Sequence, residues 1–281
     1  MKLLNGKILS DIIKNDLKNT VAEMNNCGQP IRLAVIQVGN DTASSVYVNN
    51  KRKACEFIGI ESVMFNLADI DQDTMIDLID NLNEDDSING ILVQLPLPKH
   101  LNEREILSRI SPLKDVDGFH ECNVGNLTLG SNCIASCTPS GIMKILQHYE
   151  IDVSGKECVV VGRSNIVGKS MAIMLLNSDG TVTICHSKTN NLKEVCKRAD
   201  ILVCAIGKPK FFNRDYIKDG AVVVDVGIHR QDDGKLCGDV DFEDVKDIVS
   251  AITPVPNGVG AMTVAMLMDN CVKAAKAQYA R

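Results

Sequence analysis

The chain has 281 residues, of which 45% are hydrophobic and 23% are charged, and its mean hydropathy is +0.02. This composition is typical of one or two folded domains and excludes a disordered or fibrous protein. The formal net charge of −6 argues against nucleic acid as a partner, because a phosphate-binding surface needs clustered Lys and Arg. No apolar stretch reaches the roughly 18 to 20 residues that span a bilayer, and residues 1–20 do not resemble a signal peptide. We therefore expect no membrane partner.

The 11 cysteines are scattered along the sequence. No C-x-x-C pair occurs, and the nearest pairs, Cys133 with Cys137 and Cys196 with Cys204, do not form a zinc-ligand set. A chain of this length needs no disulfides for stability. We therefore expect reduced, mostly buried thiols, a cytoplasmic location and no metal site.

Helical and strand patterns alternate along the chain, which predicts an α/β protein with mostly parallel sheets covered by helices. In the first part we predict helices within 3–24 and over 43–58 and 72–82, and strands at 33–38, 62–67 and 90–95. Residues 112–139 are rich in Gly, Asn, Asp and Ser and interrupt the pattern, so we place a domain boundary there.

A second alternating series follows this boundary. Thr138 and Pro139 are typical of an N-cap and a first helical position, and they predict a helix to about residue 150. Further predicted elements are strands at 157–162, 181–185, 201–206 and 221–226, and helices at 166–178, 191–198 and 259–279. We assign residues 1–120 with about 265–281 to a first domain and residues 138–264 to a Rossmann-like second domain, with the last helix returning to the first.

The segment from Cys158 to Gly168 predicts a phosphate-binding turn, because an apolar strand ends in Gly162 and then opens a helix. Its spacing, G-x-x-x-x-x-G, differs from the dinucleotide fingerprint G-x-G-x-x-G, so an ordinary tight turn is the alternative. The next strand is followed by His186-Ser187-Lys188, with no acid for a ribose 2′-OH. Together with Arg163 and Ser164, these donors favour NADP over NAD.

Residues 222–228, Val-Val-Val-Asp-Val-Gly-Ile, form another apolar strand that ends in glycine. Ligands of open α/β sheets bind at the carboxyl ends of strands. Gly227 and Ile228 are therefore candidates for the nicotinamide pocket, and a plain strand terminus is the alternative.

Ser44, Tyr47 and Lys51 are spaced three and four residues apart, so they share one face of the predicted helix with Cys55 and Ile58. A lysine on such an inward face must be paired or must line a cleft, where it is available for proton transfer. The alternative is a core tyrosine beside a lysine whose ammonium reaches solvent.

Two further polar positions stand out in this first part. Gln94 follows the apolar strand that starts at Gly90, where its amide can accept a hydrogen bond from an ammonium. The segment Lys114-Asp115-Val116-Asp117-Gly118-Phe119 puts two carboxylates before a glycine, and a carboxylate there suits an amino-amide edge such as that of a pterin or a guanine. The alternatives are a glutamine satisfied by backbone and an Asp-rich turn.

Seven ordered segments resemble one family, the bifunctional methylenetetrahydrofolate dehydrogenase/methenyltetrahydrofolate cyclohydrolases. They are Y-x-x-x-K, G-I-L-V-Q-L-P-L-P, K-D-V-D-G-F, C-T-P-x-G, V-V-G-R-S-x-x-V-G, H-S-K-T and T-P-V-P-x-G-V-G-x-M-T, and they extend over almost the whole chain. The resemblance implies oxidation of 5,10-methylenetetrahydrofolate by NADP and hydrolysis of the 5,10-methenyl product to 10-formyltetrahydrofolate. It also implies a folate domain, an NADP domain, a cleft between them and a homodimer.

The resemblance assigns roles residue by residue. Lys51 transfers a proton and activates water, Gln94 holds Lys51, Tyr47 stacks on the folate, and Asp117 binds the pterin. The folate contacts it implies are Tyr47, Lys51, Val93, Gln94, Leu95, Asp117, Pro256, Gly258, Val259 and Gly260. The NADP contacts it implies are Gly162, Arg163, Ser164, His186, Ser187, Gly227, Ile228 and Thr263.

Three positions depart from the family pattern. Asn257 and Ala261 stand where the closing loop usually has Gly and Pro, and Ser170 replaces a usual proline. We expect Asn257 to accept a positive φ and the altered loop to affect rate rather than reaction type. Two other interpretations remain, namely another two-domain NADP dehydrogenase of the shikimate or amino-acid type and a folate- or NADP-binding protein without catalysis.

Overall fold

The structure of the chain is a computed structural model that describes residues 1–39 and 42–280, except for the side chains of residues 42–46. The chain forms two compact units. Met1–Ser10 and Thr138–Thr263 form one, here the six-stranded unit, and Asp11–Cys137 with Val264–Arg281 form the other, here the three-stranded unit. No helix among the described residues has the length and apolarity needed to cross a membrane.

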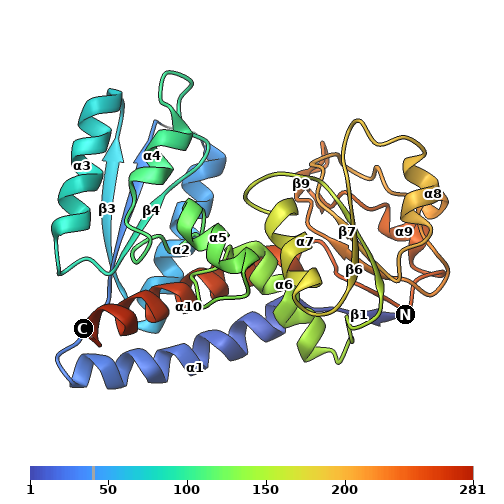
Figure 1. Cartoon of the computed structure of the whole chain (residues 1–281), viewed down its shortest axis with the longest axis horizontal. Coiled ribbons are helices and arrows are strands. Elements are labelled where there is room, and N and C mark those ends of the chain that lie inside the picture. The colour runs from blue at the N-terminus through green and yellow to red at the C-terminus, as the bar shows by residue number, and fades with distance from the viewer. Residues whose placement is uncertain (40–41, 281) are drawn as a thin grey trace. The chain divides into compact units, whose positions relative to one another are not determined.

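The three-stranded unit is a parallel sheet with helices on both faces (Figure 1). Its strands are β2 (Arg32–Val38), β3 (Glu61–Leu67) and β4 (Gly90–Val93), in the order β3-β2-β4. Its helices are α1 (Gly6–Asn26), which starts in the six-stranded unit, α2 (Thr42–Ile58), α3 (Gln72–Glu84), α4 (Glu103–Arg109), α5 (Glu121–Thr128) and the end of α10 (Val259–Tyr279).

The middle strand β2 contributes side chains to two hydrophobic clusters, one on each face of the sheet. Leu33 and Val35 point to a cluster formed with α1, α2 and α10, whereas Ala34 and Ile36 point to a cluster formed with α3 and α4. Both faces of the strand are therefore buried, as its unbroken apolar run requires.

The six-stranded unit is also built on a parallel sheet, with the order β1-β11-β8-β7-β5-β6. Its strands are β1 (Lys2–Leu3), β5 (Glu157–Val161), β6 (Thr181–Cys185), β7 (Ile201–Cys204), β8 (Val222–Asp225) and β11 (Ala251–Ile252). The covering elements are α6 (Cys137–His148), α7 (Gly168–Leu176), α8 (Leu192–Cys196), the 3₁₀ turn η1 (Arg214–Tyr216) and α9 (Phe242–Val245). A two-stranded antiparallel hairpin, β9 (His229–Arg230) with β10 (Leu236–Cys237), follows β8.

The predicted α/β class with parallel sheets is confirmed, and the last helix from residue 264 onward joins the first part of the chain as expected. Residues 1–10 differ from the expectation, because β1 pairs with β11 and so belongs to the six-stranded unit. The strand predicted at 90–95 ends at Val93, and the one at 201–206 ends at Cys204. Thr138 lies inside α6 rather than at its N-cap.

Residues 112–139, where the sequence pattern is interrupted and we placed a domain boundary, contain a helix that the sequence did not indicate, α5. This helix is short and rich in residues of low helix propensity, so its sequence gives little local signal. Side-chain contacts hold it instead. His120 accepts a hydrogen bond from the Cys122 N–H at 3.0 Å, and the Asn123 amide donates to Pro112 O at 2.9 Å.

Candidate active site

Lys51 and Gln94 meet in the three-stranded unit. The Lys51 Nζ donates a hydrogen bond to Gln94 Oε1 at 3.0 Å, and Gln94 Nε2 donates to Leu95 O at 2.6 Å. The Gln94 N–H also donates to Ile36 O at 2.9 Å, which fixes the residue at the carboxyl end of β4. The amide is therefore oriented with its oxygen toward the ammonium.

The face of α2 that carries Lys51 changes from buried to exposed along the helix. Cys55 is fully buried and Ile58 is 2% exposed, whereas Lys51 is half-buried and Tyr47 is 43% exposed. Tyr47 is thus not a core residue, and its ring is available for stacking. Ser44, which the sequence placed on the same face, lies outside the residues whose side chains are described.

Asp117 adds a carboxylate to the same electrostatic environment. Burial raises the pKa of Asp117 to about 6, the positive charge of Lys51 acts to lower it, and the charge of Asp115 acts to raise it. Among the described residues, no N–H or O–H group donates a hydrogen bond to this carboxylate. Its acceptor oxygens are therefore free for a ligand.

The segment around Asp117 is held by buried polar contacts. The Lys114 ammonium donates to three carbonyl oxygens at the end of α3, Leu82 O at 3.0 Å and Asn83 O and Asp85 O at 2.8 Å each. Burial lowers the pKa of Lys114, although the charges of Asp85 and Asp86 oppose the shift. Because its hydrogen bonds are made to backbone, Lys114 anchors the segment.

The Asp115 carboxylate fixes the other side of the same turn. It accepts hydrogen bonds from the backbone N–H groups of Gly118 at 3.1 Å and His120 at 2.8 Å, and from Asn123 Nδ2 at 3.0 Å. Gly118 has φ +72°, and a Cβ there would lie 2.5 Å from Ala135 C. The two carboxylates of K-D-V-D-G therefore have different surroundings, since Asp115 is fully bonded and Asp117 is not.

Asn270 on α10 completes this support. It is 2% exposed, and its Nδ2 donates to Val116 O and to Ala135 O at 2.9 Å each. The sequence placed Lys114 and Asp115 in the K-D-V-D-G-F segment without indicating their structural roles, and it did not indicate Asn123 or Asn270 at all. The available signal for Asn270 was an amide within an otherwise apolar face of the last helix.

The cysteines beside this site are protonated. Burial raises the pKa of Cys55 to about 12 and the pKa of Cys137 well above its usual range. A thiol in this state is neither a nucleophile nor a metal ligand. All 11 cysteines are free, and among the described residues no three His, Cys, Asp or Glu side chains are grouped as a metal ion requires.

The turn after β5 has the backbone shape that a dinucleotide needs. Gly162 has φ +132°, and a Cβ there would collide with Ala205 O. A Cβ on Gly168, at the start of α7, would collide with Gly162 O. Between them, Ser164 Oγ accepts from the N–H groups of Val167 at 3.2 Å and Gly168 at 3.4 Å. The chain thus passes close to the neighbouring strand and the helix start, with Arg163 exposed in the turn.

Donor groups also follow the neighbouring strand β6. The His186 N–H donates to Thr189 Oγ1 at 2.9 Å, and His186 Nδ1 accepts from the Lys188 N–H at 3.2 Å. Ser187 and Lys188 are exposed. Since β5 and β6 are adjacent and parallel, Arg163 and these residues lie at the same edge of the sheet. That edge offers positive charge and hydroxyl donors to a phosphate.

The loop from Thr253 to Gly258 leads into α10, which begins at Val259. Asn257 has φ +74°, so the expectation that it accepts a positive φ is confirmed. Its carbonyl oxygen accepts from the Lys7 N–H at 3.1 Å. Pro256 is exposed, while Gly258 and Val259 are buried.

Two contacts hold the start of α10 within the six-stranded unit. Ile228 is 41% exposed, and a Cβ on Gly260 would lie 2.7 Å from Ile228 Cδ1. Thr263 Oγ1 is 2.9 Å from Thr138 Oγ1. The start of α10, at Gly260, therefore packs against Ile228 in the turn that follows β8. Ser170, 1% exposed, is buried within α7.

Two family models match the chain, and together they cover most of it. The catalytic domain of tetrahydrofolate dehydrogenase/cyclohydrolase matches residues 4–117, and the NAD(P)-binding domain of the same family matches residues 136–279. A protein of Lachnoclostridium phytofermentans named bifunctional protein FolD is 58% identical over 275 residues, which are 98% of each chain. The chain belongs to the tetrahydrofolate dehydrogenase/cyclohydrolase family.

Solved structures of this family agree closely with the fold. The bifunctional methylenetetrahydrofolate dehydrogenase/cyclohydrolase of Campylobacter jejuni has a TM-score of 0.97 and 50% identity over 99% of both chains. The Trypanosoma brucei enzyme, solved in complex with NADP and an inhibitor, has a TM-score of 0.94 and 34% identity over 99% of this chain and 98% of its own.

Membership of the tetrahydrofolate dehydrogenase/cyclohydrolase family confirms the resemblance, the enzyme class and the predicted NAD(P)-binding domain. The chain is a bifunctional enzyme of one-carbon folate metabolism. The interpretation as a dehydrogenase of the shikimate or amino-acid type is thereby replaced.

Proposed function

We propose that the chain oxidises 5,10-methylenetetrahydrofolate with NADP and hydrolyses the resulting 5,10-methenyl cation through Lys51, Gln94, Tyr47 and Asp117. The observation that carries the proposal is the hydrogen bond from Lys51 Nζ to Gln94 Oε1 beside an unbonded Asp117 carboxylate. In the family architecture the folate belongs to the catalytic domain, which here matches residues 4–117.

Asp117 and Tyr47 bind the substrate in this proposal. The free oxygens of Asp117 accept hydrogen bonds from the pterin amino group and the adjacent ring N–H. A carboxylate paired with two donors is a stronger acceptor than a neutral amide. The exposed ring of Tyr47 stacks on the aminobenzoate ring. The further proposed folate contacts are Val93 and Leu95, on either side of Gln94, and Pro256, Gly258, Val259 and Gly260.

The first reaction requires that the methylene carbon be held in near-attack geometry. When bound, NADP supplies the hydride acceptor. Gly162, Arg163, Ser164, His186, Ser187, Gly227, Ile228 and Thr263 are the residues proposed to hold it. Gly162 and Gly168 allow the close backbone packing between β5 and the start of α7, where the phosphates are proposed to bind, and Arg163 with Ser187 suits the 2′-phosphate.

The second reaction opens the methenyl cation with water. The carbon is already electrophilic, so the step needs a positioned water and a proton acceptor. The Lys51 amine accepts one proton from the water as the new C–O bond forms. The second proton passes from the resulting hydroxyl to the ring nitrogen whose C–N bond breaks, and the formyl group stays on the other nitrogen. Gln94 holds the Lys51 amine in place through Oε1 while its own Nε2 is fixed by Leu95 O.

Substitution of Lys51 by Met tests this assignment. Lys51→Met removes the proton acceptor but keeps the length of the side chain, so we expect at least a ~100-fold loss of cyclohydrolase rate, within the range typical of general-base catalysis. NADP binding and the circular dichroism spectrum should remain those of the wild type. Lys53→Met, an exposed lysine on the same helix, is the matched control. Formation of 10-formyltetrahydrofolate by Lys51→Met at the wild-type rate contradicts the assignment.

Substitution of Arg163 tests the preference for NADP. Arg163→Ala removes a charge-assisted hydrogen bond worth about 1.5 to 3 kcal/mol, so kcat/KM with NADP should fall roughly 10- to 150-fold and that with NAD much less. Arg198→Ala removes the same charge from another exposed position and should change neither value. Equal losses with both cofactors in Arg163→Ala would remove the argument for 2′-phosphate recognition.

We also propose a homodimer in the cytoplasm. The resemblance to the family supports the dimer, and the presence of 11 free cysteines supports a reducing compartment. The chain has a mass of 30.6 kDa, so sedimentation at twice this mass is expected, and a single-chain mass contradicts the dimer.

A further inference from the structure

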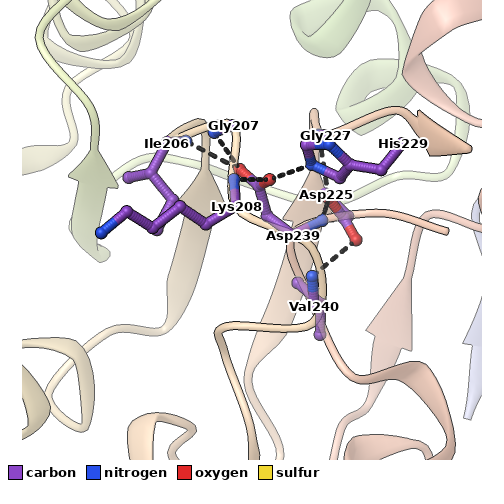
Figure 2. A network of polar contacts seen from close by, with 8 residues as sticks. All are labelled: Ile206, Gly207, Lys208, Asp225, Gly227, His229, Asp239 and Val240. Carbon is purple, nitrogen blue, oxygen red and sulfur yellow. Dashed lines mark hydrogen bonds and ion pairs between the residues drawn. The ribbon is translucent and has the colours of Figure 1, made fainter. Parts of the chain in front are cut away.

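A buried carboxylate organises the loops beside the proposed cofactor residues of the six-stranded unit. Asp239, which follows the β9–β10 hairpin, is 0% exposed. Its Oδ2 accepts from the N–H groups of Ile206 at 2.7 Å and Gly207 at 3.0 Å, and its Oδ1 accepts from the Lys208 N–H at 2.8 Å (Figure 2). Three successive backbone donors thus converge on one side chain.

Convergent backbone N–H groups at the carboxyl end of a strand form an anion-binding nest. Here the nest follows β7 and is filled by the protein's own carboxylate. The three N–H groups are therefore not free for a phosphate of the cofactor. The loop is instead fixed before any ligand arrives, because a carboxylate with several N–H donors is held by charge-assisted hydrogen bonds.

A second carboxylate, Asp225, places Asp239. Asp225 lies at the end of β8 and is 4% exposed. Its Oδ1 accepts from the N–H groups of Gly227 at 2.9 Å and Asp239 at 2.8 Å, and its Oδ2 accepts from the Val240 N–H at 2.9 Å. A Cβ on Gly238 would collide with the Asp225 carboxylate. Burial raises the pKa of Asp225 to about 6 despite these donors.

His229 and Thr253 extend the network to the two neighbouring loops. His229 Nε2 lies 2.8 Å from Asp239 Oδ1, and His229 directly follows Ile228 (Figure 2). Thr253 Oγ1 accepts from the Asp225 N–H at 2.8 Å, at the start of the loop that leads to α10. The network therefore joins the loops after β7 and β8 to the loop that begins at Thr253.

We propose that Asp239 is a positioning residue for the dehydrogenase reaction. It holds Ile206–Lys208 directly and the Gly227–Ile228 turn through His229 and Asp225, so that these two loops form a rigid surface for the nicotinamide half of NADP. The inference rests on the proposed function, which puts Gly227 and Ile228 at the cofactor. The hydride acceptor must be held within a narrow geometry, and a mobile loop would not provide it.

The test compares Asp239→Asn with Asp241→Asn in the full-length enzyme. Both oxygens of Asp239 accept hydrogen bonds from backbone N–H groups. In Asp239→Asn one of these oxygens is replaced by an NH₂ group, which cannot accept, so at least one of the hydrogen bonds from Ile206–Lys208 is lost. Asp241→Asn removes the same charge two residues away, where the side chain makes no capping hydrogen bond. The measurements are KM for NADP, KM for methylenetetrahydrofolate, and the hydrolysis of methenyltetrahydrofolate without cofactor.

We expect Asp239→Asn to raise KM for NADP about tenfold or more, consistent with the loss of one charge-assisted hydrogen bond. The folate KM and the cofactor-free hydrolysis should stay within about twofold, which excludes general misfolding, and Asp241→Asn should match the wild type. His229→Leu, which leaves the three backbone donors of Asp239 in place, should raise KM for NADP about threefold, and His229→Gln should restore it by supplying a donor. If Asp239→Asn does not fold, the KM values for NADP of His229→Leu and His229→Gln test the proposal instead.

Wild-type KM for NADP in both Asp239→Asn and His229→Leu overturns the proposal. An equal fall in the rates of both reactions in folded Asp239→Asn, with an unchanged KM for NADP, overturns it as well. Failure of the proposed function itself is recognised separately, because the wild-type enzyme would then reduce no NADP with methylenetetrahydrofolate.

Discussion

At the scale of single residues, the site depends on a contrast between two neighbouring carboxylates. Asp115 has three hydrogen-bond donors, whereas Asp117 has none among the described residues and a pKa of about 6. A half-buried carboxylate without hydrogen-bond donors destabilises the free protein. In the proposed function, the bound folate supplies the missing donors.

Asp117→Asn should therefore stabilise the ligand-free protein at neutral pH. In the folded protein the pKa of Asp117 is raised from the usual 3.8 to about 6. Ionisation of Asp117 therefore lowers the free energy of unfolding, and this loss is complete above pH 6. The cost shrinks as pH falls from 6 toward 4 and is absent below the unfolded pKa. We expect a gain of up to about 3 kcal/mol at pH 7.5 and almost none at pH 3.5, measured by urea unfolding.

Asp247→Asn, at an exposed position, is the control for this experiment and should change stability by less than about 0.5 kcal/mol. Lower stability of Asp117→Asn at pH 7.5 would mean that the carboxylate has structural partners in the folded protein. The same ionisation predicts that kcat/KM for methylenetetrahydrofolate declines as pH falls through about 6, since protonation removes an acceptor.

Sequence reasoning identified Lys51 and Gln94 because helical spacing and a polar residue at a strand end are local patterns. It did not predict the structural roles of Lys114 and Asn270, because these roles depend on hydrogen bonds to backbone groups that are distant in the sequence. Lys114 reaches the end of α3, and Asn270 reaches residues more than 130 positions earlier in the chain. No local pattern contains such information.

At the scale of elements, the turn that carries Asp117 is defined by one glycine. Gly118 combines φ +72° with close approach to the backbone of residues 134–136, so a side chain there is excluded for two reasons. Gly130 offers a direct comparison, since it has φ +69° but no other atom within 4 Å of the position that a Cβ would occupy.

Gly118→Ala should accordingly cost much more stability than Gly130→Ala. The shared positive φ costs about 1 kcal/mol in each, and the collision adds about 1 to 3 kcal/mol at Gly118 only. We further expect Gly118→Ala to raise KM for folate, because Asp117 precedes it. Equal losses of unfolding free energy in the two variants would show that the turn has room to adjust.

Helices and strands were predicted correctly where the periodic pattern of apolar residues is long. The last helix was predicted at 259–279 and occurs there, because its apolar pattern is long. The short strands β1 and β11, with two residues each, carry no periodic signal. Their pairing also joins residues almost 250 positions apart, which local sequence cannot indicate.

At the scale of the whole molecule, two units are each assembled from separate segments of the chain. Residues 1–10 complete the sheet of one unit, and residues 264–281 complete the core of the other. The catalytic-domain match begins at residue 4 and the NAD(P)-binding match ends at residue 279, so the family boundaries and the compact units differ at both ends of the chain. Each compact unit therefore combines segments that lie far apart in the sequence.

The central claim is that this one chain performs both reactions, with NADP as the preferred cofactor. A single spectrophotometric assay tests it by adding methylenetetrahydrofolate with NADP or with NAD and following reduced cofactor and methenyltetrahydrofolate together. We predict faster reduction of NADP than of NAD, with no accumulation of the methenyl product. Absence of reduction with both cofactors, or methenyl product that accumulates as fast as NADP is reduced, would contradict the account.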